Sequence, residues 1–391
     1  MAYFDHAATT PVLPEALAAW TAAAGRVGNA SSVHASGRRA RRTVEEARES
    51  IAQSLGARPG EVIFTSGGTE ADNLALKGIA WARRAGDPMR RRVLVSAVEH
   101  KAVLDPAGWL AARGDTTVEL LPVDASGRLD LAAFRLSIER DPASVALVSV
   151  MWANNEVGTV QPVAEVAELC RQYGIPVHSD AVQAVSTLPV AASLVDALTV
   201  SGHKLGAPVG VGVLVLGRDV DVVPVLHGGG QERDVRSGTL APADAAALAA
   251  ALRVVVAERD QHAARLATLR ADAERRITAA VPEAMITAAD AVRLPGISHL
   301  TFPGCEGDAL LMLLDAAGVE CSTGSACAAG ILQPSHVLMA IGIQPQRARG
   351  SLRLSYGRQT TAADVDELLA ALPPAVARAR RAGLVATADR S

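Results

Sequence analysis

The sequence predicts an α/β fold, in which a mostly parallel sheet has helices on both faces and a smaller α+β domain is attached. Apolar runs rich in β-branched residues alternate with helical patterns between about residues 60 and 217. These runs are apolar throughout, which is typical of strands buried on both faces of a sheet. After about residue 240 the pattern changes to a long helical stretch followed by shorter elements.

The expected elements follow this alternation along the chain. In the first part we expect strands at 61–65, 92–97, 146–152, 175–179, 197–201 and 211–216, and helices at 70–84, 103–113 and 163–173. The long helix is expected at 243–276, followed by strands at 296–302, 319–321 and 351–356 and helices at 307–316, 335–341 and 362–382. Residues 14–255 are therefore expected to form a large domain, and residues 1–13 and 256–391 a small one.

The composition excludes several classes of protein. A hydrophobic content of 49% with 20% charged residues indicates a globular chain, and a net charge of -3 gives no electrostatic reason to expect nucleic acid as a partner. The first ten residues contain Asp5 and lack the basic start of a signal peptide. The longest apolar stretch, 243–257, is interrupted by Asp244 and Arg253, and it is shorter than the ~20 residues of a membrane span. We therefore expect a cytoplasmic protein without a membrane partner.

A glycine-rich turn is the first candidate for a binding site. The letters FTSGGTE at 64–70 end an expected strand and open an expected helix. Gly68 and Thr69 would present backbone N–H groups and a hydroxyl at the start of that helix, an arrangement that binds phosphate. The alternative is an ordinary turn in which Thr69 caps the helix. The spacing does not match GxxxxGK[ST], so a nucleotide-binding P-loop is not expected.

Lysine is scarce in this chain. Only Lys77, Lys101 and Lys204 are present among the 38 basic residues. Lysine can form a Schiff base when its pKa is lowered, whereas arginine stays protonated. Lys204 and Asp180 each follow an expected strand, so both should point into the crevice at the carboxyl ends of the strands. A simple ion pair between them is the alternative.

A phosphate anchor, a buried acid and a reactive amine are together what pyridoxal 5'-phosphate requires. The chain resembles the NifS/IscS-type cysteine desulfurases of the class V aminotransferase family, which depend on this cofactor and have fold type I. The resemblance rests on YFDHAATT at 3–10, GNASS at 28–32, TSGGTEADN at 65–73, VEH at 98–100, NNEVG at 154–158, SDAVQ at 179–183, SGHK at 201–204, GGGQER at 228–233, RSGT at 236–239, STGSAC at 322–327 and RLS at 353–355.

The resemblance implies a role for each matching residue. Lys204 would bind the cofactor covalently, Asp180 would pair with its ring nitrogen, and His100 would stack on the ring. The other implied contacts are Gln183 to the phenolic oxygen, Asn155 to the ring and the substrate carboxylate, Gly68, Thr69, Ser201, His203 and the partner subunit's Thr239 to the phosphate, and Arg353 to the substrate carboxylate. The large domain would then bind pyridoxal phosphate.

The same resemblance identifies the catalytic thiol. Cys170 lies in an expected helix and is interpreted as a core residue, whereas Cys305 and Cys321 have nothing nearby that would activate them. Cys327 lies in GSACAAG at 324–330, a run of small residues in the small domain. The resemblance implies that Cys327 accepts the sulfur of L-cysteine as a persulfide. No CxxC spacing is present, so no metal site is expected.

The resemblance also implies a reaction and partners. L-Cysteine would give L-alanine, the chain would form a homodimer, and Cys327 would pass sulfur to an acceptor protein for iron–sulfur cluster assembly and other sulfur-transfer pathways. The long stretch from Cys327 to Arg353 is similar to the IscS-like group. The C-terminal region lacks that group's docking tail, so the acceptor's identity stays open. A selenocysteine lyase, another class V aminotransferase and a non-catalytic sulfur or iron–sulfur scaffold are the alternative functions.

Overall fold

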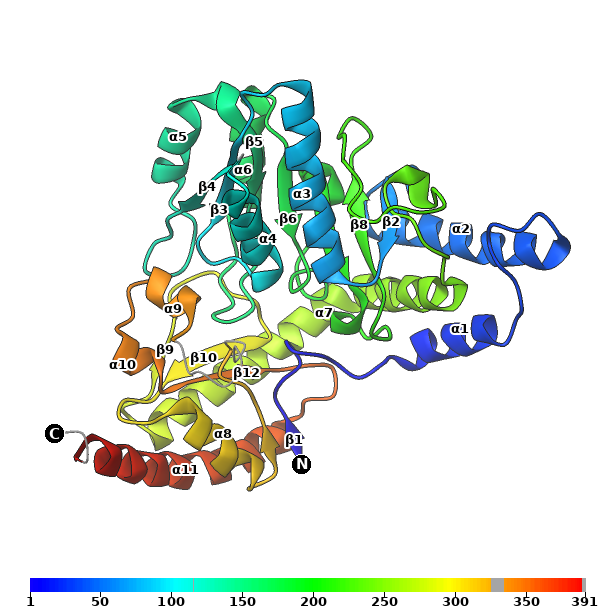
Figure 1. The fold of residues 1–391 in the computed structure, drawn as a ribbon. Helices are drawn as coiled ribbons and strands as arrows, with labels where there is room; N and C mark the ends of the chain where they lie inside the picture. Colours follow the sequence, from blue (N-terminus) through cyan, green and yellow to red (C-terminus); the bar gives the residue numbers. More distant parts are fainter. Residues whose placement is uncertain (115, 325–333, 389–391) are drawn as a thin grey trace.

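A seven-stranded sheet forms the centre of the molecule (Figure 1). The structure is a computed structural model, and it describes residues 1–114, 116–324 and 334–388. The strand order is β2-β8-β7-β6-β5-β3-β4, and only β8 runs antiparallel to its two neighbours. The strands are β2 (Val62–Thr65), β3 (Arg92–Ser96), β4 (Thr117–Leu121), β5 (Val145–Ser149), β6 (Val177–Asp180), β7 (Ala197–Ser201) and β8 (Gly212–Leu216). The predicted mostly parallel sheet is therefore confirmed.

Helices cover both faces of this sheet (Figure 1). They are α3 (Gly68–Gly86) and α4 (Lys101–Ala112) on one face and α5 (Leu131–Glu139) and α6 (Val163–Gln172) on the other. Leu74 of α3 and Leu110 of α4 pack with Val93 in one buried cluster, and Phe134 of α5 and Val166 of α6 belong to another. Strands buried on both faces are apolar throughout, which explains why continuous apolar runs in the sequence predicted these strands.

One long helix connects the central sheet to the smaller sheets. Helix α7 (Pro242–Ala280) packs against α1 (Pro14–Ala24) and α2 (Ala35–Leu55) near its start, and its later residues Leu266 and Ile277 belong to a separate core. The remaining elements are β1 (Ala2–Tyr3), β9 (Met285–Ile286), β10 (Ile297–Thr301), α8 (Gly307–Asp315), β11 (Val319–Glu320), α9 (His336–Ala340), α10 (Pro345–Ala348), β12 (Ser351–Ser355) and α11 (Ala362–Ala388).

The strands among these remaining elements form two small sheets. Strands β12, β10 and β9 form an antiparallel sheet, and β1 pairs in parallel with β11. The expected domain boundary at residue 255 falls inside α7, a continuous helix that packs with both parts of the molecule. The division of the chain into two domains at residues 13 and 255 therefore stays a prediction. None of the helices in the described part of the chain combines the length and the apolar character needed to cross a membrane.

A buried ion pair fixes helix α2 to the turn at η5 (Glu232–Asp234). Arg48 donates from Nη1 and Nη2 to the two carboxylate oxygens of Glu232, at 2.8 and 2.6 Å, and Phe64 of β2 donates its N–H to the same carboxylate at 2.8 Å. Glu232, Arg233 and Asp234 all have positive φ, a conformation that costs non-glycine residues free energy. The ion pair therefore holds a strained turn against the central sheet.

Replacing Glu232 by alanine should destabilise the protein by about 3 kcal/mol, because the buried Arg48 guanidinium loses the carboxylate that takes two of its hydrogen bonds and keeps only the carbonyl of Val62 and the exposed Glu45. The free energy of unfolding of the transition that includes the central sheet measures this effect. The control is Glu139→Ala, which removes an exposed pair with Arg135 on α5 and should cost below about 0.5 kcal/mol. Equal losses in the two variants would contradict the role given to the buried pair.

Candidate active site

A cavity of about 520 Å³ opens at the carboxyl ends of the central strands. It is lined by Gly68, Thr69, His100, Asn155, Asp180, Gln183, Ser201, His203, Lys204 and Arg353, so these predicted site residues lie together. Thr239 is exposed on the surface and does not line this cavity in its own chain. Cys327 lies outside the described residues. The volume is within the range of sites for cofactors and other small molecules.

The start of α3 forms one wall of the cavity. Gly67 has φ +153°, a conformation that side-chain-bearing residues rarely adopt, and a Cβ on Gly68 would lie 3.0 Å from Val182 Cγ2. Gly67 is the residue that precedes the helix and no side chain caps it, so the alternative of a Thr69 cap is wrong. The first N–H groups of a helix have no acceptor within the helix. They face the cavity beside the side chains of Thr69 and Ser201.

Asp180 is the last residue of β6 and also lines the cavity. Its Oδ1 accepts the N–H of Val182 at 2.8 Å, and the residue is only 6% exposed. Burial raises the pKa of Asp180 to about 7, and the carboxylate of Asp72 raises it further, whereas Lys204 opposes the shift. A carboxyl group in this environment readily holds or shares a proton near neutral pH.

Lys204 ends a short turn, η4 (Gly202–Lys204), that follows β7. Its Nζ donates to the carbonyl oxygens of Ala7 at 2.6 Å and Ala8 at 2.5 Å. Burial and then the charge of Arg353 lower the pKa of Lys204 to about 8, although Asp5 and Asp180 oppose the shift. The amine therefore bonds to neutral acceptors instead of forming the alternative ion pair with Asp180, and about half of it is unprotonated at pH 8.

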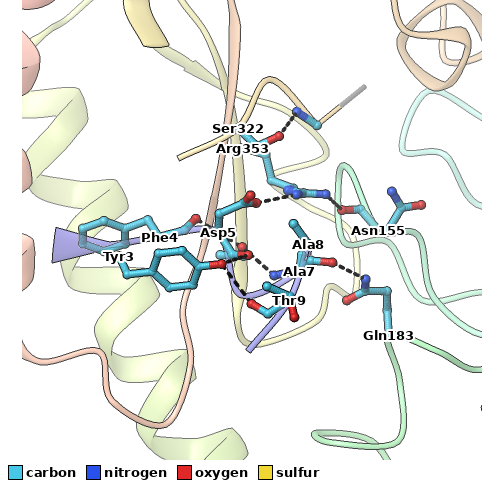
Figure 2. A network of polar contacts seen from close by, with 12 residues as sticks. Tyr3, Phe4, Asp5, Ala7, Ala8, Thr9, Asn155, Gln183, Ser322 and Arg353 are labelled. Atoms are coloured by element: carbon cyan, nitrogen blue, oxygen red, sulfur yellow. Dashed lines mark hydrogen bonds and ion pairs between the residues drawn. The ribbon is translucent and has the colours of Figure 1, made fainter. Parts of the chain in front are cut away.

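Arg353 of β12 forms a network with the N-terminal segment (Figure 2). Its Nη2 donates to Asp5 Oδ1 at 2.7 Å and its Nη1 to the carbonyl of Asn155 at 3.0 Å. Gln183 donates from Nε2 to the carbonyl of Ala7 at 2.9 Å. The Nε of Arg353 is buried and has no hydrogen-bond partner. Nη1 and Nη2 each carry two N–H groups and use one of them in these bonds, so each keeps a second N–H beside the cavity.

Both cavity histidines that the sequence singled out are neutral near pH 7. His100 precedes α4, and its Nδ1 accepts the N–H of Ala102 at 3.1 Å, so a neutral ring carries its proton on Nε2. Burial and then Lys204 lower the pKa of His100. The same two causes, in the same order, lower the pKa of His203 to about 4, and its Nδ1 lies 3.3 Å from Thr9 Oγ1.

Several functional candidates were not found from the sequence. Asp72 lines the cavity, and Glu99 and His178 are fully buried near Asp180. Two spacings in the sequence could have indicated Asp72 and His178. Asp72 follows Thr69 by three residues, which places it on the same helix face. His178 precedes Asp180 by two residues, which places both side chains on the same side of β6.

The segment that carries Cys327 adjoins the cavity at both of its described flanks. Gly324 on one side and Pro334 on the other line the cavity. Ser335 donates from Oγ to Glu156 Oε2 at 2.5 Å, and a Cβ on Gly324 would lie 3.6 Å from Glu156. Within residues 1–114, 116–324 and 334–388, no group of three or more histidine, cysteine, aspartate or glutamate residues is arranged to hold a metal ion.

The class-V aminotransferase family matches residues 2–368. The chain belongs to this family. An IscS-like cysteine desulfurase of Mycobacterium tuberculosis is 55% identical over 99% of both chains, and a cysteine desulfurase of Cereibacter sphaeroides is 42% identical over 97% of this chain and 96% of its own. A solved NifS-like protein superposes with a TM-score of 0.89 at 32% identity, covering 97% of this chain and 100% of its own. The predicted family and fold type I architecture are therefore confirmed.

The titration of Lys204 can be observed directly, because the chain has only three lysines. In cofactor-free protein with isotope-labelled lysine, the NMR signal that Lys204→Arg removes should titrate near pH 8, where burial and Arg353 place its pKa. Lys77→Arg, the control, should remove a different signal and leave this titration unchanged. Titration of the Lys204 signal near the ordinary value of 10.5 would contradict the depressed pKa.

Proposed function

We propose that this protein is a pyridoxal phosphate-dependent cysteine desulfurase, which converts L-cysteine to L-alanine and holds the sulfur as a persulfide on Cys327. The observation that carries the proposal is that the Lys204 amine, with its lowered pKa, lies in one cavity with buried Asp180. The described flanks of the Cys327 segment line the same cavity. Relatives named cysteine desulfurase, aligned over almost the whole chain, support it.

The cavity fits pyridoxal phosphate in its donor groups and its shape. The glycine turn before α3 leaves room where a side chain on Gly68 would collide with Val182, and the helix start favours an anion there. We assign the phosphate to Gly68, Thr69, Ser201 and His203. Asp180 would supply a buried acid for the ring nitrogen, and His100, which lines the same cavity, is assigned to stack on the ring. Gln183 and Asn155 are assigned to the phenolic oxygen and to the ring with the substrate carboxylate.

Lys204 is assigned two tasks. Its amine would hold the cofactor, and the unprotonated amine would accept the α-proton of the substrate at Nζ. A pKa of about 8 allows both tasks, because the group readily gains and loses a proton near neutral pH. When bound, the cofactor makes the α-hydrogen of an amino acid acidic by delocalising the electrons that remain.

Arg353 is assigned to the substrate carboxylate. Its Nη1 and Nη2 each use one hydrogen bond in the structure, to Asn155 and Asp5, and each has a second N–H to donate. Because the Nε is buried, a carboxylate would bind at the two terminal nitrogens. This arrangement selects an amino acid and fixes its orientation in the cavity.

The sulfur transfer balances without an external oxidant. The Cys327 thiolate attacks the substrate sulfur, a sulfur–sulfur bond forms, the substrate carbon–sulfur bond breaks, and a proton takes the place of sulfur on carbon. The products are alanine and a persulfide. Only the thiolate is nucleophilic, so the thiol must lose a proton. We assign acceptance of this proton to His100, because only a neutral imidazole can accept a proton and burial lowers the pKa of this ring.

The remaining parts of the proposal concern partners and location. We propose that the protein acts in the cytoplasm as a homodimer, in which the partner subunit's Thr239 contacts the phosphate, and that an acceptor protein receives the sulfur for iron–sulfur cluster assembly. The exposure of Thr239 outside its own cavity supports a contact across an interface.

A comparison with the described cysteines supports the choice of Cys327 as the nucleophile. Burial raises the pKa values of the Cys170 and Cys321 thiols to about 12, which disfavours their thiolate forms.

Replacing Cys327 by alanine should abolish sulfur release and persulfide formation from L-cysteine, because no other thiol is assigned to the cavity. Alanine, sulfide and protein-bound persulfide are quantified after incubation of the holoenzyme with L-cysteine. Cys305→Ala is the control and should keep the activity of the unchanged protein. Full turnover of cysteine by Cys327→Ala would exclude the proposed mechanism and favour an aminotransferase. The same assay with selenocysteine separates a selenocysteine lyase.

Replacing Arg353 by glutamine should lower kcat/KM for L-cysteine roughly thirtyfold, since a charged hydrogen bond is worth about 2 kcal/mol. Arg349→Gln is the matched control, because Arg349 is an exposed arginine that lines the same cavity. It should change kcat/KM less than about threefold, because a solvent-exposed charge contributes little. Equal losses in both variants would show that the overall charge, rather than a specific contact, binds the carboxylate.

A further inference from the structure

A cluster of buried polar side chains lies beneath Asp180, between the central sheet and α3. Ser149 pairs in register with His178 on the next strand, and Asp180 pairs with Thr199 on the strand after that. Residues paired in register point to the same face of a sheet, as do His178 and Asp180, which are two apart. Helix α3 packs on β5, β6 and β7, and Asp72 is on this helix.

His178 connects the members of this cluster. Its Nδ1 lies 2.9 Å from Ser149 Oγ, and its Nε2 lies 3.0 Å from Thr199 Oγ1 and 3.4 Å from Asp72 Oδ1. Burial lowers the pKa of His178 to about 4, so the ring is neutral near pH 7. A neutral ring has one N–H and no net charge. His178 therefore orders the cluster without neutralising a carboxylate.

Asp72 has no cationic partner among the described residues. It is 1% exposed, and its Oδ1 lies 3.4 Å from the neutral ring of His178 without forming a hydrogen bond. Burial raises the pKa of Asp72 to about 7, against the effect of the Thr199 hydroxyl. The other ionisable groups that influence this region are the acids Asp180 and Glu99 and, acting on Asp180, the amine of Lys204. An unpaired buried carboxylate is costly, so the cluster is arranged to receive a positive charge.

We propose that Asp72 is a positioning residue that acts through Asp180 to retain the proton shared by Asp180 and the ring nitrogen of bound pyridoxal phosphate. The proposal rests on the proposed function, because it requires this cofactor in the cavity. A second carboxylate behind Asp180 raises the proton affinity of the pair formed by Asp180 and the ring nitrogen. The proton belongs to the pair, and Asp72 holds it there by its charge.

An analogue of the cofactor isolates this effect. In 1-deazapyridoxal 5'-phosphate a C–H replaces the ring nitrogen, so the analogue keeps the phosphate and the aldehyde but cannot share the proton. The equilibrium dissociation constants of both compounds are measured for the apoprotein at pH 8, where Asp72 is largely ionised. The ratio of the two constants reports the ring nitrogen alone, because the phosphate and Lys204 contacts are common to both.

The unchanged protein should prefer pyridoxal phosphate, and Asp72→Asn should reduce this preference about tenfold, corresponding to one pKa unit. Its affinity for the deaza analogue should stay within about threefold, which shows that the cavity is intact. Glu70→Gln is the matched control. It neutralises another carboxylate on α3, one that bonds to Arg236 at 2.7 Å and is not part of the cluster. It should leave the ratio unchanged.

One result would overturn the proposal: a ratio in Asp72→Asn equal to that of the unchanged protein. This includes the case in which the variant binds both compounds more weakly by the same factor, as it would if Asp72 had a purely structural role. Failure of the unchanged protein to bind either compound would instead overturn the proposed function. The variant is expected to fold, because it replaces a buried charge that has no cationic partner by an amide of the same shape.

Discussion

The carbonyl oxygen of Ala7 holds the two sides of the active site together. Lys204 and Gln183, which follow strands of the central sheet, both donate to it, while the N–H of Ala7 donates to Ser355 Oγ on β12 at 2.8 Å. A carbonyl oxygen accepts hydrogen bonds without carrying a charge. It therefore positions the Lys204 amine without the stabilisation that a direct carboxylate contact would give to the ammonium form. The pKa of the amine can then stay at the low value that burial and Arg353 produce.

The cavity is lined by charged groups of both signs. Arg353 is paired with Asp5 of the N-terminal segment, so the guanidinium is held in place while part of its charge is compensated. The acids Asp72 and Asp180 are buried without an ion pair to a described lysine or arginine. A ligand that carries an anion at one end and binds a proton at the other would satisfy both kinds of group. Pyridoxal phosphate together with an amino acid has this distribution of charge.

The periodicity of the sequence predicted most strands because a doubly covered sheet requires continuous apolar runs. Helices α1 and α2 were not predicted. Helix α2 is rich in arginine and glutamate, and its buried stripe includes alanine and Arg48, whose charge is balanced by a residue 184 positions away. Strand β5 ends three residues earlier than predicted: the N–H groups of Val150 and Trp152 still bond to carbonyls of β6, but the N–H of Met151 bonds to the Glu99 side chain. The roles of Asp72 and His178 likewise depend on packing between distant elements, which local patterns do not contain.

Asn155 and Glu156 connect the substrate-binding residue to the segment of the proposed nucleophile. The carbonyl of Asn155 accepts from Arg353, and the next residue, Glu156, accepts from Ser335 and packs against Gly324. A Cβ on Gly324 would also lie 3.5 Å from the Cβ of Arg353. Arg353, which we propose binds the substrate carboxylate, and both described flanks of the Cys327 segment therefore contact the same two neighbouring residues. In the proposed mechanism a carboxylate held by Arg353 would also orient the substrate sulfur, and an in-line transfer between two sulfur atoms requires such an orientation.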